Sequence, residues 1–214
     1  MLLRDRTIAY NRAAFFTLNI LVTQSLLQLT DLACERDGRT LFRALNLAVL
    51  PGHCVELTGP NGSGKSTLLR CITGLYPDYE GEIEVDSFHY LGHKAGISPL
   101  LTPAQNLQWY AGFDGAEVDV EKALERLGLA GYELVRCHHL SAGQQRRVSL
   151  ARLLVTQADL WLLDEPFTAL DSAGQNLVRE LIGEHQQSGG AALCATHQAL
   201  EIPDARALQL GKLA

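Results

Sequence analysis

The chain has 214 residues, of which 47% are hydrophobic and 20% charged, with a formal net charge of −6. This composition is typical of a globular domain with a sizeable core and excludes a fibrous or disordered chain. The acidic balance offers no basic stripe to neutralise phosphates, so we expect no nucleic-acid partner. The five cysteines are odd in number and form no Cys-x-x-Cys pair, which indicates reduced thiols in a cytoplasm, not a disulfide framework or a zinc site.

Residues 1–25 form an N-terminal extension ahead of the first predicted strand. Its apolar stretch, Ala13 to Val22, follows three arginines and is shorter than the roughly 20 residues that span a bilayer. Three interpretations remain open. The extension is a signal or transit peptide, a short segment that lies on a surface or contacts a partner, or the result of a start codon assigned too early, with the natural chain beginning near Val22.

Strand-like and helix-like segments alternate along the rest of the chain, which predicts an α/β fold with a largely parallel sheet. Two amphipathic strands are expected in SLLQLTDLAC and TLFRALNLAVL, then a buried strand in HCVELTG and a helix over residues 66–73. GEIEVDSFHYLGH predicts one or two strands, and residues 102–136 have a helical, more polar pattern. The remaining expected elements are a helix in LSAGQQRRVSLARLL, a strand in ADLWLLDE, a helix over 172–187, and strands in AALCAT and ARALQL.

The stretch GPNGSGKST fits the pattern G-x-x-x-x-G-K-[ST] between a hydrophobic strand and a helix. Its glycines allow positive φ and close backbone approach, so successive N–H groups can surround a triphosphate at a helix N-terminus. The lysine would place its charge on the β- and γ-phosphates, and the serine would offer a hydroxyl oxygen to Mg²⁺. The predicted ATP-binding residues are Gly59, Pro60, Asn61, Gly62, Ser63, Gly64, Lys65, Ser66 and Thr67.

The stretch LWLLDEP places Asp164 and Glu165 at the end of an apolar strand. Such a strand in a parallel sheet is buried on both faces, so charge at its carboxyl end is expected where a ligand binds. We expect Asp164 to orient Mg²⁺ together with Ser66. Glu165, on the other side of the pleat, would polarise the water that attacks the γ-phosphate.

These motifs, with LSAGQ further on, resemble the ATP-binding subunit of ABC transporters from about Leu26 to the C-terminus. The resemblance implies a P-loop NTPase domain over residues 26–214, with a mostly parallel core sheet flanked by helices, a small antiparallel β part and a helical subdomain at about 98–155. It also implies a signature turn that contacts the γ-phosphate held by a second subunit, so the ATP site is complete only in a head-to-tail homodimer. The implied signature residues are Leu140, Ser141, Ala142, Gly143 and Gln144, with Ala142 replacing the first glycine of the family pattern.

Two further motifs follow in the family's order. TALD resembles the loop that crosses the dimer interface, with Asp171 as the implied contact. ATHQ places His197 at the position of the switch histidine, which implies that it senses the γ-phosphate and orients the attacking water. The resemblance thus implies an ATPase with ATP and Mg²⁺ as cofactors, catalysis by Glu165 and His197, and integral membrane transporter subunits as partners.

The chain departs from the family pattern in four places. His93 stands where the family usually has a glutamine that touches Mg²⁺ and relays closure of the dimer to the membrane partner. Because Mg²⁺ prefers oxygen to imidazole, the role of His93 as a metal ligand is in doubt, while its role in coupling stands. Arg36 stands where many members stack an aromatic side chain on adenine, and it either stacks its guanidinium there or lies in solvent. The short segment from Gly81 to His93 predicts a truncated antiparallel sheet. VRCHH, residues 135–139, is either a haem or metal contact or a linker.

Within the family, CERDGRTLF, YLGH, LSAGQQRRV, and LWLLDEPFTALD with ATHQ resemble the ATP-binding subunit of the cytochrome c maturation (haem exporter) system. This resemblance implies two copies bound peripherally to the cytoplasmic face of the bacterial inner membrane. ATP turnover would power haem delivery, with haem contacted only indirectly. Three alternatives remain open: an ABC ATPase for another cargo, a soluble ABC ATPase, and a P-loop kinase, which would lack the signature turn.

Overall fold

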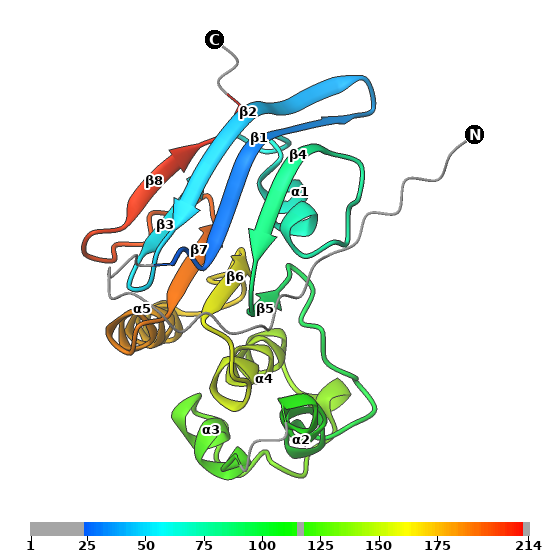
Figure 1. Ribbon diagram of the computed structural model, residues 1–214. Coiled ribbons are helices and arrows are strands. Elements are labelled where there is room, and N and C mark those ends of the chain that lie inside the picture. Colours follow the sequence, from blue (N-terminus) through cyan, green and yellow to red (C-terminus); the bar gives the residue numbers. More distant parts are fainter. Residues whose placement is uncertain (1–23, 115–117, 212–214) are drawn as a thin grey trace.

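The computed structural model describes residues 24–114 and 118–211, so the N-terminal apolar stretch discussed above lies outside the described residues. The strands are β1 (Leu27–Arg36), β2 (Arg39–Val49), β3 (Cys54–Thr58), β4 (Glu80–Val85), β5 (Phe88–Leu91), β6 (Leu160–Asp164), β7 (Ala191–Ala195) and β8 (Arg206–Gln209). The helices are α1 (Lys65–Ile72), α2 (Pro103–Asp114), α3 (Val120–Arg126), α4 (Ala142–Val155) and α5 (Ser172–Gln187), with a 3₁₀ turn at Cys137–His139. Helices α2, α3 and α4 gather at one end of the molecule, with α4 next to the parallel sheet and α2 and α3 farther from it (Figure 1).

The antiparallel sheet has three strands in the order β2-β1-β4. Leu27, Leu29 and Leu32 of β1 are fully buried. Their spacing changes from two residues to three at an irregularity in the pairing with β2, where Asp31 has a φ of 48°. A bulge of this kind returns the next leucine to the buried face. The segment before His93, expected to shorten this sheet, forms two strands: β4, with six residues, belongs here, and β5 belongs to the other sheet.

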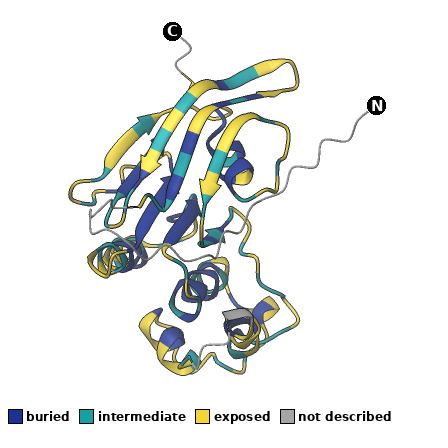
Figure 2. Cartoon of the chain, in the orientation of Figure 1, coloured by how far each residue is buried: buried dark blue, intermediate teal, exposed yellow. Residues whose placement is uncertain are grey.

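The second sheet is parallel, in the order β5-β6-β7-β3-β8. Every residue of β6 and β7 is buried, as Figure 2 shows. This is why both strands read as continuous apolar runs, since helices or another sheet cover both faces of a parallel sheet. Leu160 and Leu162 face the core shared with the antiparallel sheet and α1, whereas Trp161 and Leu163 face the core shared with the other helices.

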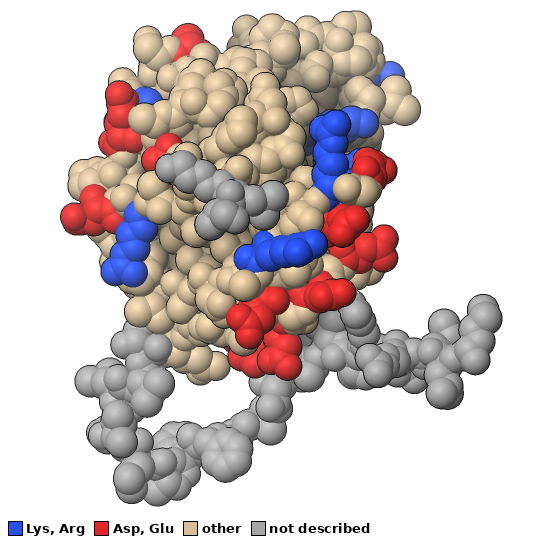
Figure 3. Space-filling model, turned by 90° about the horizontal axis from the view of Figure 1, so that it is seen from above, with Lys and Arg blue, Asp and Glu red and all other residues tan. Residues whose placement is uncertain are grey.

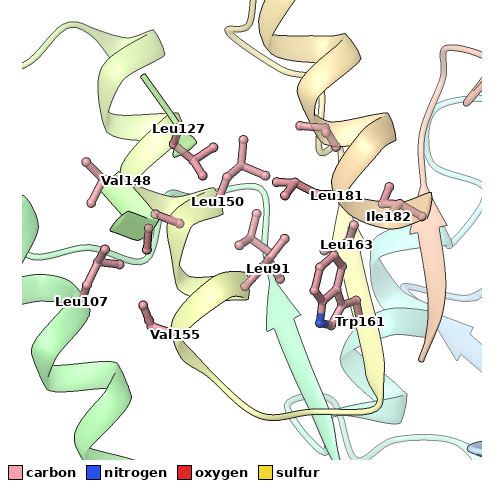
Figure 4. Packing of buried hydrophobic residues seen from close by; sticks show 14 of the residues in the cluster. Leu91, Leu107, Leu127, Val148, Leu150, Val155, Trp161, Leu163, Leu181 and Ile182 are labelled. Carbon is pink, nitrogen blue, oxygen red and sulfur yellow. The ribbon is translucent and has the colours of Figure 1, made fainter. Parts of the chain in front are cut away.

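Helix α4 connects the helical end of the molecule to the parallel sheet. In Figure 4, Leu150 of α4 lies next to Leu91 of β5 and Leu181 of α5, while Val148 lies on the side of Leu107 of α2. Apolar side chains on two sides of α4 are therefore buried. This packing fixes the position of the helix, and so of the turn that precedes it, relative to the ends of the strands.

The carboxyl ends of β3, β6 and β7 meet at one edge of the parallel sheet, because the three strands run in the same direction. The glycine-rich loop follows β3, Glu165 follows β6, and Thr196 and His197 follow β7. Ligands of open α/β sheets bind at this edge.

On the face of the molecule shown in Figure 3, acidic and basic side chains lie beside one another. None of the helices in the described ranges is long and apolar enough to cross a bilayer.

Candidate active site

The loop between β3 and α1 depends on glycine at defined positions. Gly59, Gly62 and Gly64 have φ values of 141°, 80° and 100°, which other residues rarely adopt. A Cβ atom on Gly59 would lie 2.5 Å from the carbonyl oxygen of Leu210, and one on Gly64 would lie 3.0 Å from Cβ of Leu41. The loop can therefore follow this path only with glycine at these positions.

This loop forms one wall of a cavity of about 510 Å³, a volume within the range of small-molecule sites. The opposite wall comes from the β1–β2 hairpin and includes Arg36, whose side chain is 48% exposed and pairs with Asp37 at 3.5 Å. Arg36 therefore lies on the cavity wall, where stacking on a base and contact with solvent are both open to it. The cavity lining consists of Arg36, Asp37, Arg39, Leu41, Asn61, Gly62, Ser63, Gly64, Lys65, Ser66, Thr67 and Glu165.

The Lys65 ammonium group folds back over the loop. It donates hydrogen bonds to the carbonyl oxygens of Gly59 at 2.7 Å and Pro60 at 3.3 Å. Gly59 and Pro60 thus lie behind the cavity as supports for the lysine, while residues 61–67 line it. A phosphate oxygen in the cavity would meet a cation that these carbonyls already hold in place.

Ser66 and Asp164 form a candidate cation site. The Ser66 hydroxyl donates to Oδ1 of Asp164 at 2.9 Å, and Oδ2 of Asp164 is buried with no hydrogen-bond partner among the described residues. Burial raises the pKa of the Asp164 carboxyl, and the bond from Ser66 opposes this shift. A buried carboxylate oxygen without a partner is costly unless a cation or a water binds it. A hydroxyl and a carboxylate are the hard oxygen donors that Mg²⁺ prefers, so these residues fit that ion.

His93 is exposed, yet it lies close enough to Asp164 to favour the ionised form of that carboxyl.

The VRCHH segment does not gather its three ligand-type side chains. Cys137 is fully buried and accepts a hydrogen bond from Nδ2 of Asn106 at 3.4 Å, whereas His138 and His139 are exposed. Over the described ranges, no group of three His, Cys, Asp or Glu side chains could hold a metal ion. The metal-contact interpretation of VRCHH therefore finds no support in the geometry.

Glu165 and His197 meet at the end of the parallel sheet. Nδ1 of His197 lies 2.7 Å from Oε2 of Glu165. Because β6 pairs directly with β7, residues that follow the two strands come together. The Glu165 side chain is 19% exposed at the cavity wall, and the His197 side chain is 57% exposed. A carboxylate aligned by an imidazole next to a phosphate-binding loop can accept a proton from a water molecule.

The signature turn begins helix α4. Ser141 is the N-cap residue, and its Oγ accepts a hydrogen bond from the Gln144 N–H at 3.2 Å. Oε1 of Gln144 accepts one from the Ser141 N–H at 2.9 Å, which completes a capping box. Ser141 and Ala142 are exposed, and Leu140 is buried. A Cβ atom on Gly143 would lie 3.0 Å from the carbonyl oxygen of Ala169, so glycine lets the TALD loop pass close to the helix.

The structure does not bring the signature turn to the phosphate loop of the same chain, since none of residues 140–144 lines the cavity.

Asp171 has a role within the chain. Its Oδ1 accepts hydrogen bonds from the Gly174 N–H at 2.9 Å and from Nη2 of Arg147 at 3.0 Å, which caps α5 and ties the TALD loop to α4. The bond from Gly174 is the main reason why the pKa of Asp171 is lowered.

The sequence analysis did not single out the buried polar residues of α4. Arg146, Ser149 and Arg152 recur every three residues and are nearly or fully buried. Ser149 Oγ donates to the Ala95 carbonyl at 2.5 Å, and Nη1 of Arg152 donates to the same carbonyl at 3.3 Å. These bonds hold the loop that follows His93. The available signal was the polar spacing itself, which places all three side chains on one face of a helix that is otherwise apolar there.

Comparison with known proteins identifies the family. The ABC transporter family profile matches residues 42–168, which is more than half of the chain. The chain belongs to the ABC transporter family. Members with the fold and motifs described above are ATP-hydrolysing subunits, which generally dimerise and join membrane components, and this chain is an ATP-binding ATPase of that kind.

Three relatives are named cytochrome c biogenesis ATP-binding export protein CcmA. The protein from Saccharophagus degradans is 41% identical over 85% of this chain and 92% of its own length. Those from Hahella chejuensis and Escherichia coli K12 are 45% and 43% identical, over 87% and 85% of this chain and 96% and 93% of their own lengths.

Solved structures have the same fold. An ABC transporter ATP-binding protein from Pyrococcus furiosus is 26% identical, with a TM-score of 0.76 over 86% of this chain and 96% of that chain. An inward-facing ABC transporter described as of the metal-chelate type is also 26% identical, with a TM-score of 0.72 over 89% of this chain and 81% of that chain.

Proposed function

We propose that this chain, as a homodimer beneath integral membrane subunits, hydrolyses ATP to power haem delivery for the maturation of c-type cytochromes. The similarity to relatives named cytochrome c biogenesis export proteins supports the cargo. The contact between Glu165 and His197 beside the phosphate-loop cavity carries the catalytic part of the proposal. Haem is contacted by the membrane partners, and this chain supplies the energy.

The phosphate loop binds the triphosphate through backbone N–H groups of the segment that lines the cavity and through the ammonium group of Lys65. Ser66 and Asp164 would hold Mg²⁺, because the serine hydroxyl and the unpartnered Asp164 oxygen are the donors available there. The bound ion would supply positive charge to the phosphate oxygens. The remaining steps belong to this chain's own side chains.

Glu165 is the group that polarises the attacking water. Its carboxylate lies at the cavity wall, and the bond to Nδ1 of His197 limits the directions in which Oε2 can point. His197 thereby orients the carboxylate, and its exposed ring lies where it can meet the γ-phosphate. The pairing of β6 with β7 fixes the contact between Glu165 and His197, which lowers the cost of ordering the site during the reaction.

Ser141 contacts the γ-phosphate bound to the other subunit. Its oxygen accepts from the Gln144 N–H, so its hydroxyl hydrogen remains available for donation to a phosphate oxygen. The first N–H groups of the 14-residue helix α4 point the same way and favour an anion. Because the turn is exposed and remote from its own cavity, a head-to-tail homodimer accounts for it better than a monomer does. Asp171, in the loop beside the turn, contacts the partner in that dimer.

His93 is the coupling residue. It begins the loop that Ser149 and Arg152 hold against α4, and it lies near Asp164. Movement of a membrane subunit docked beside this loop would be transmitted through these contacts to Asp164, at the carboxyl end of β6. We place the assembly at the cytoplasmic face of the bacterial inner membrane, with this chain bound peripherally.

The test uses cells whose only copy of the protein carries Glu165→Gln. Loss of haem-stained c-type cytochromes, with the apoproteins still secreted, is the expected result. The matched control is Glu184→Gln. This substitution removes the same charge from α5, where Glu184 pairs with Arg126, and does not touch the cavity or His197. Normal haem staining with Glu165→Gln, in an assembly that has lost ATP hydrolysis, would show that the transporter carries a different cargo. The assignment of ATPase activity would be unaffected.

A further inference from the structure

Arg146 of α4 reaches the catalytic strand from the helix that carries the signature turn. Its side chain is only 4% exposed. The guanidinium group donates to three backbone carbonyls, those of Gly92 at 3.1 Å, Asp164 at 3.3 Å and Glu165 at 2.7 Å. One side chain thus joins the Gly92 carbonyl, at the start of the coupling loop, to the consecutive backbone carbonyls of Asp164 and Glu165.

The backbone of Glu165 is strained. Its φ is 52°, in the left-handed region that costs free energy for a residue with a side chain. Its N–H donates to the Ala195 carbonyl at 2.8 Å, and its own carbonyl accepts from Arg146 and, at 3.3 Å, from the Thr168 N–H. Such a conformation persists only where the surroundings hold it. The shortest bond to that carbonyl comes from Arg146.

Burying this guanidinium is costly. Removal of water lowers the pKa of Arg146 to about 10, although the nearby carboxyls of Asp164 and Glu165 favour its charged form. Its Nε has no hydrogen-bond partner among the described residues. An apolar side chain of similar volume would pack at lower cost. What an apolar side chain lacks is the planar fork of donors that can bind carbonyls of two separate segments at once.

We propose that Arg146 is a positioning residue for ATP hydrolysis, which fixes the backbone of Glu165 and the start of the coupling loop so that the catalytic carboxylate faces the cavity. This inference rests on the catalytic role proposed for Glu165. Arg146 itself touches neither ATP nor the attacking water. Its effect is on the rate of hydrolysis and not on the binding of ATP, since Arg146 is not among the residues that line the cavity.

The experiment uses the full chain purified together with its membrane subunits. Arg146→Gln keeps a polar side chain but loses the charged fork, and Arg146→Lys keeps the charge with a single donor group. We expect Arg146→Gln to lower kcat at least tenfold, per ATP-binding site counted in the same sample, with the KM for ATP within threefold of the parent. Arg146→Lys should recover part of the rate, because an ammonium group can reach one of the three carbonyls.

Arg179→Gln is the matched control. Arg179 also donates to a backbone carbonyl, that of Leu200 at 2.7 Å, and its guanidinium lies over the ring of Phe167. It contacts neither Asp164 nor Glu165. We expect this variant to lower the Tm as Arg146→Gln does but to keep kcat per site within twofold of the parent.

The proposal is overturned if Arg146→Gln keeps kcat per site within twofold of the parent, if Arg179→Gln loses as much rate, or if the loss lies in the KM. Glu165→Gln is measured in the same assay. Hydrolysis at the parent rate in that variant overturns the catalytic role of Glu165. An inactive Glu165→Gln beside a normal Arg146→Gln overturns the positioning role alone.

Discussion

Nδ1 of His197 lies 2.7 Å from Oε2 of Glu165, although the two residues follow different strands. The contact exists because β6 and β7 are neighbours in the parallel sheet and both end at the same edge. It places an imidazole and a carboxylate side by side at the wall of the cavity that the phosphate loop lines. This pair is where the structure is most informative about the chemistry.

Replacing His197 with alanine removes the group that orients Glu165. We expect kcat for ATP hydrolysis to fall about 100-fold, because Glu165 loses the group that aligns it for proton transfer. The affinity for ATP should stay nearly unchanged because the phosphate loop is intact. Phosphate release from the purified transporter measures kcat. His138→Ala, at an exposed ring outside the cavity, serves as the control, and a His197→Ala rate within twofold of the parent would count against the role of the pair.

Mixing two inactive variants tests the head-to-tail dimer. Lys65→Ala and Ser141→Ala should each be inactive alone. In a mixed dimer, one composite site carries both substitutions and the other carries neither, so random mixing should restore about a quarter of the parental sites. Restored phosphate release on co-expression is the expected result. If each chain completed its own site, every site in the mixture would carry one defect and no activity would return.

Gly59→Ala tests whether the phosphate loop requires its backbone path. The new Cβ would lie 2.5 Å from the Leu210 carbonyl at a φ of 141°. We expect the free energy of unfolding to fall by about 1 to 3 kcal/mol and ATP binding to be lost, measured by thermal unfolding and nucleotide titration. Gly183→Ala is the control, since a Cβ there meets nothing within 4 Å inside helix α5. That variant should gain about 0.5 to 1 kcal/mol.

His89 predicts a pH dependence of stability. It is 7% exposed, with Nδ1 close to Oγ1 of Thr156, and burial, aided by the charge of Arg152, lowers its pKa to about 3. The folded state therefore keeps His89 neutral, whereas the unfolded chain binds a proton below about pH 6.5. Stability is lost as the pH falls from that value toward 3.

His89→Gln should remove this contribution. Relative to the variant, the parent should lose about 2 kcal/mol of unfolding free energy between pH 7 and pH 5. Denaturant unfolding of both proteins across this range provides the measurement. Parallel pH curves for the two proteins would show that His89 does not titrate on unfolding.

Local patterns were enough to predict much of this molecule. The glycines at 59, 62 and 64 indicate a phosphate loop, because glycine is the residue type that tolerates their positive φ values. The continuous apolar runs of β6 and β7 likewise reveal strands buried on both faces. The spacing of Ser141 and Gln144 is also that of a capping box, which the sequence analysis did not identify.

Contacts between distant segments could not be read this way. Hydrophobic periodicity tells which face of an element is buried but not which element covers it, so the role of Arg146 stayed hidden among the residues of an amphipathic helix. The partner of Asp171 within the chain, Arg147, stayed hidden for the same reason. The split of GEIEVDSFHYLGH between two sheets was equally invisible, because strand order depends on pairing between residues far apart in the chain.

The sequence by itself was enough to identify the family and to predict the nucleotide and the residues proposed to bind phosphate, because these depend on residue types at fixed short spacings. The tertiary structure decided which groups act together. Glu165 meets His197 only because β6 and β7 pair, and Arg146 holds Glu165 only because α4 packs against the ends of β5 and β6. Those neighbours are set by the burial of apolar faces across the whole fold, which no short stretch of sequence contains.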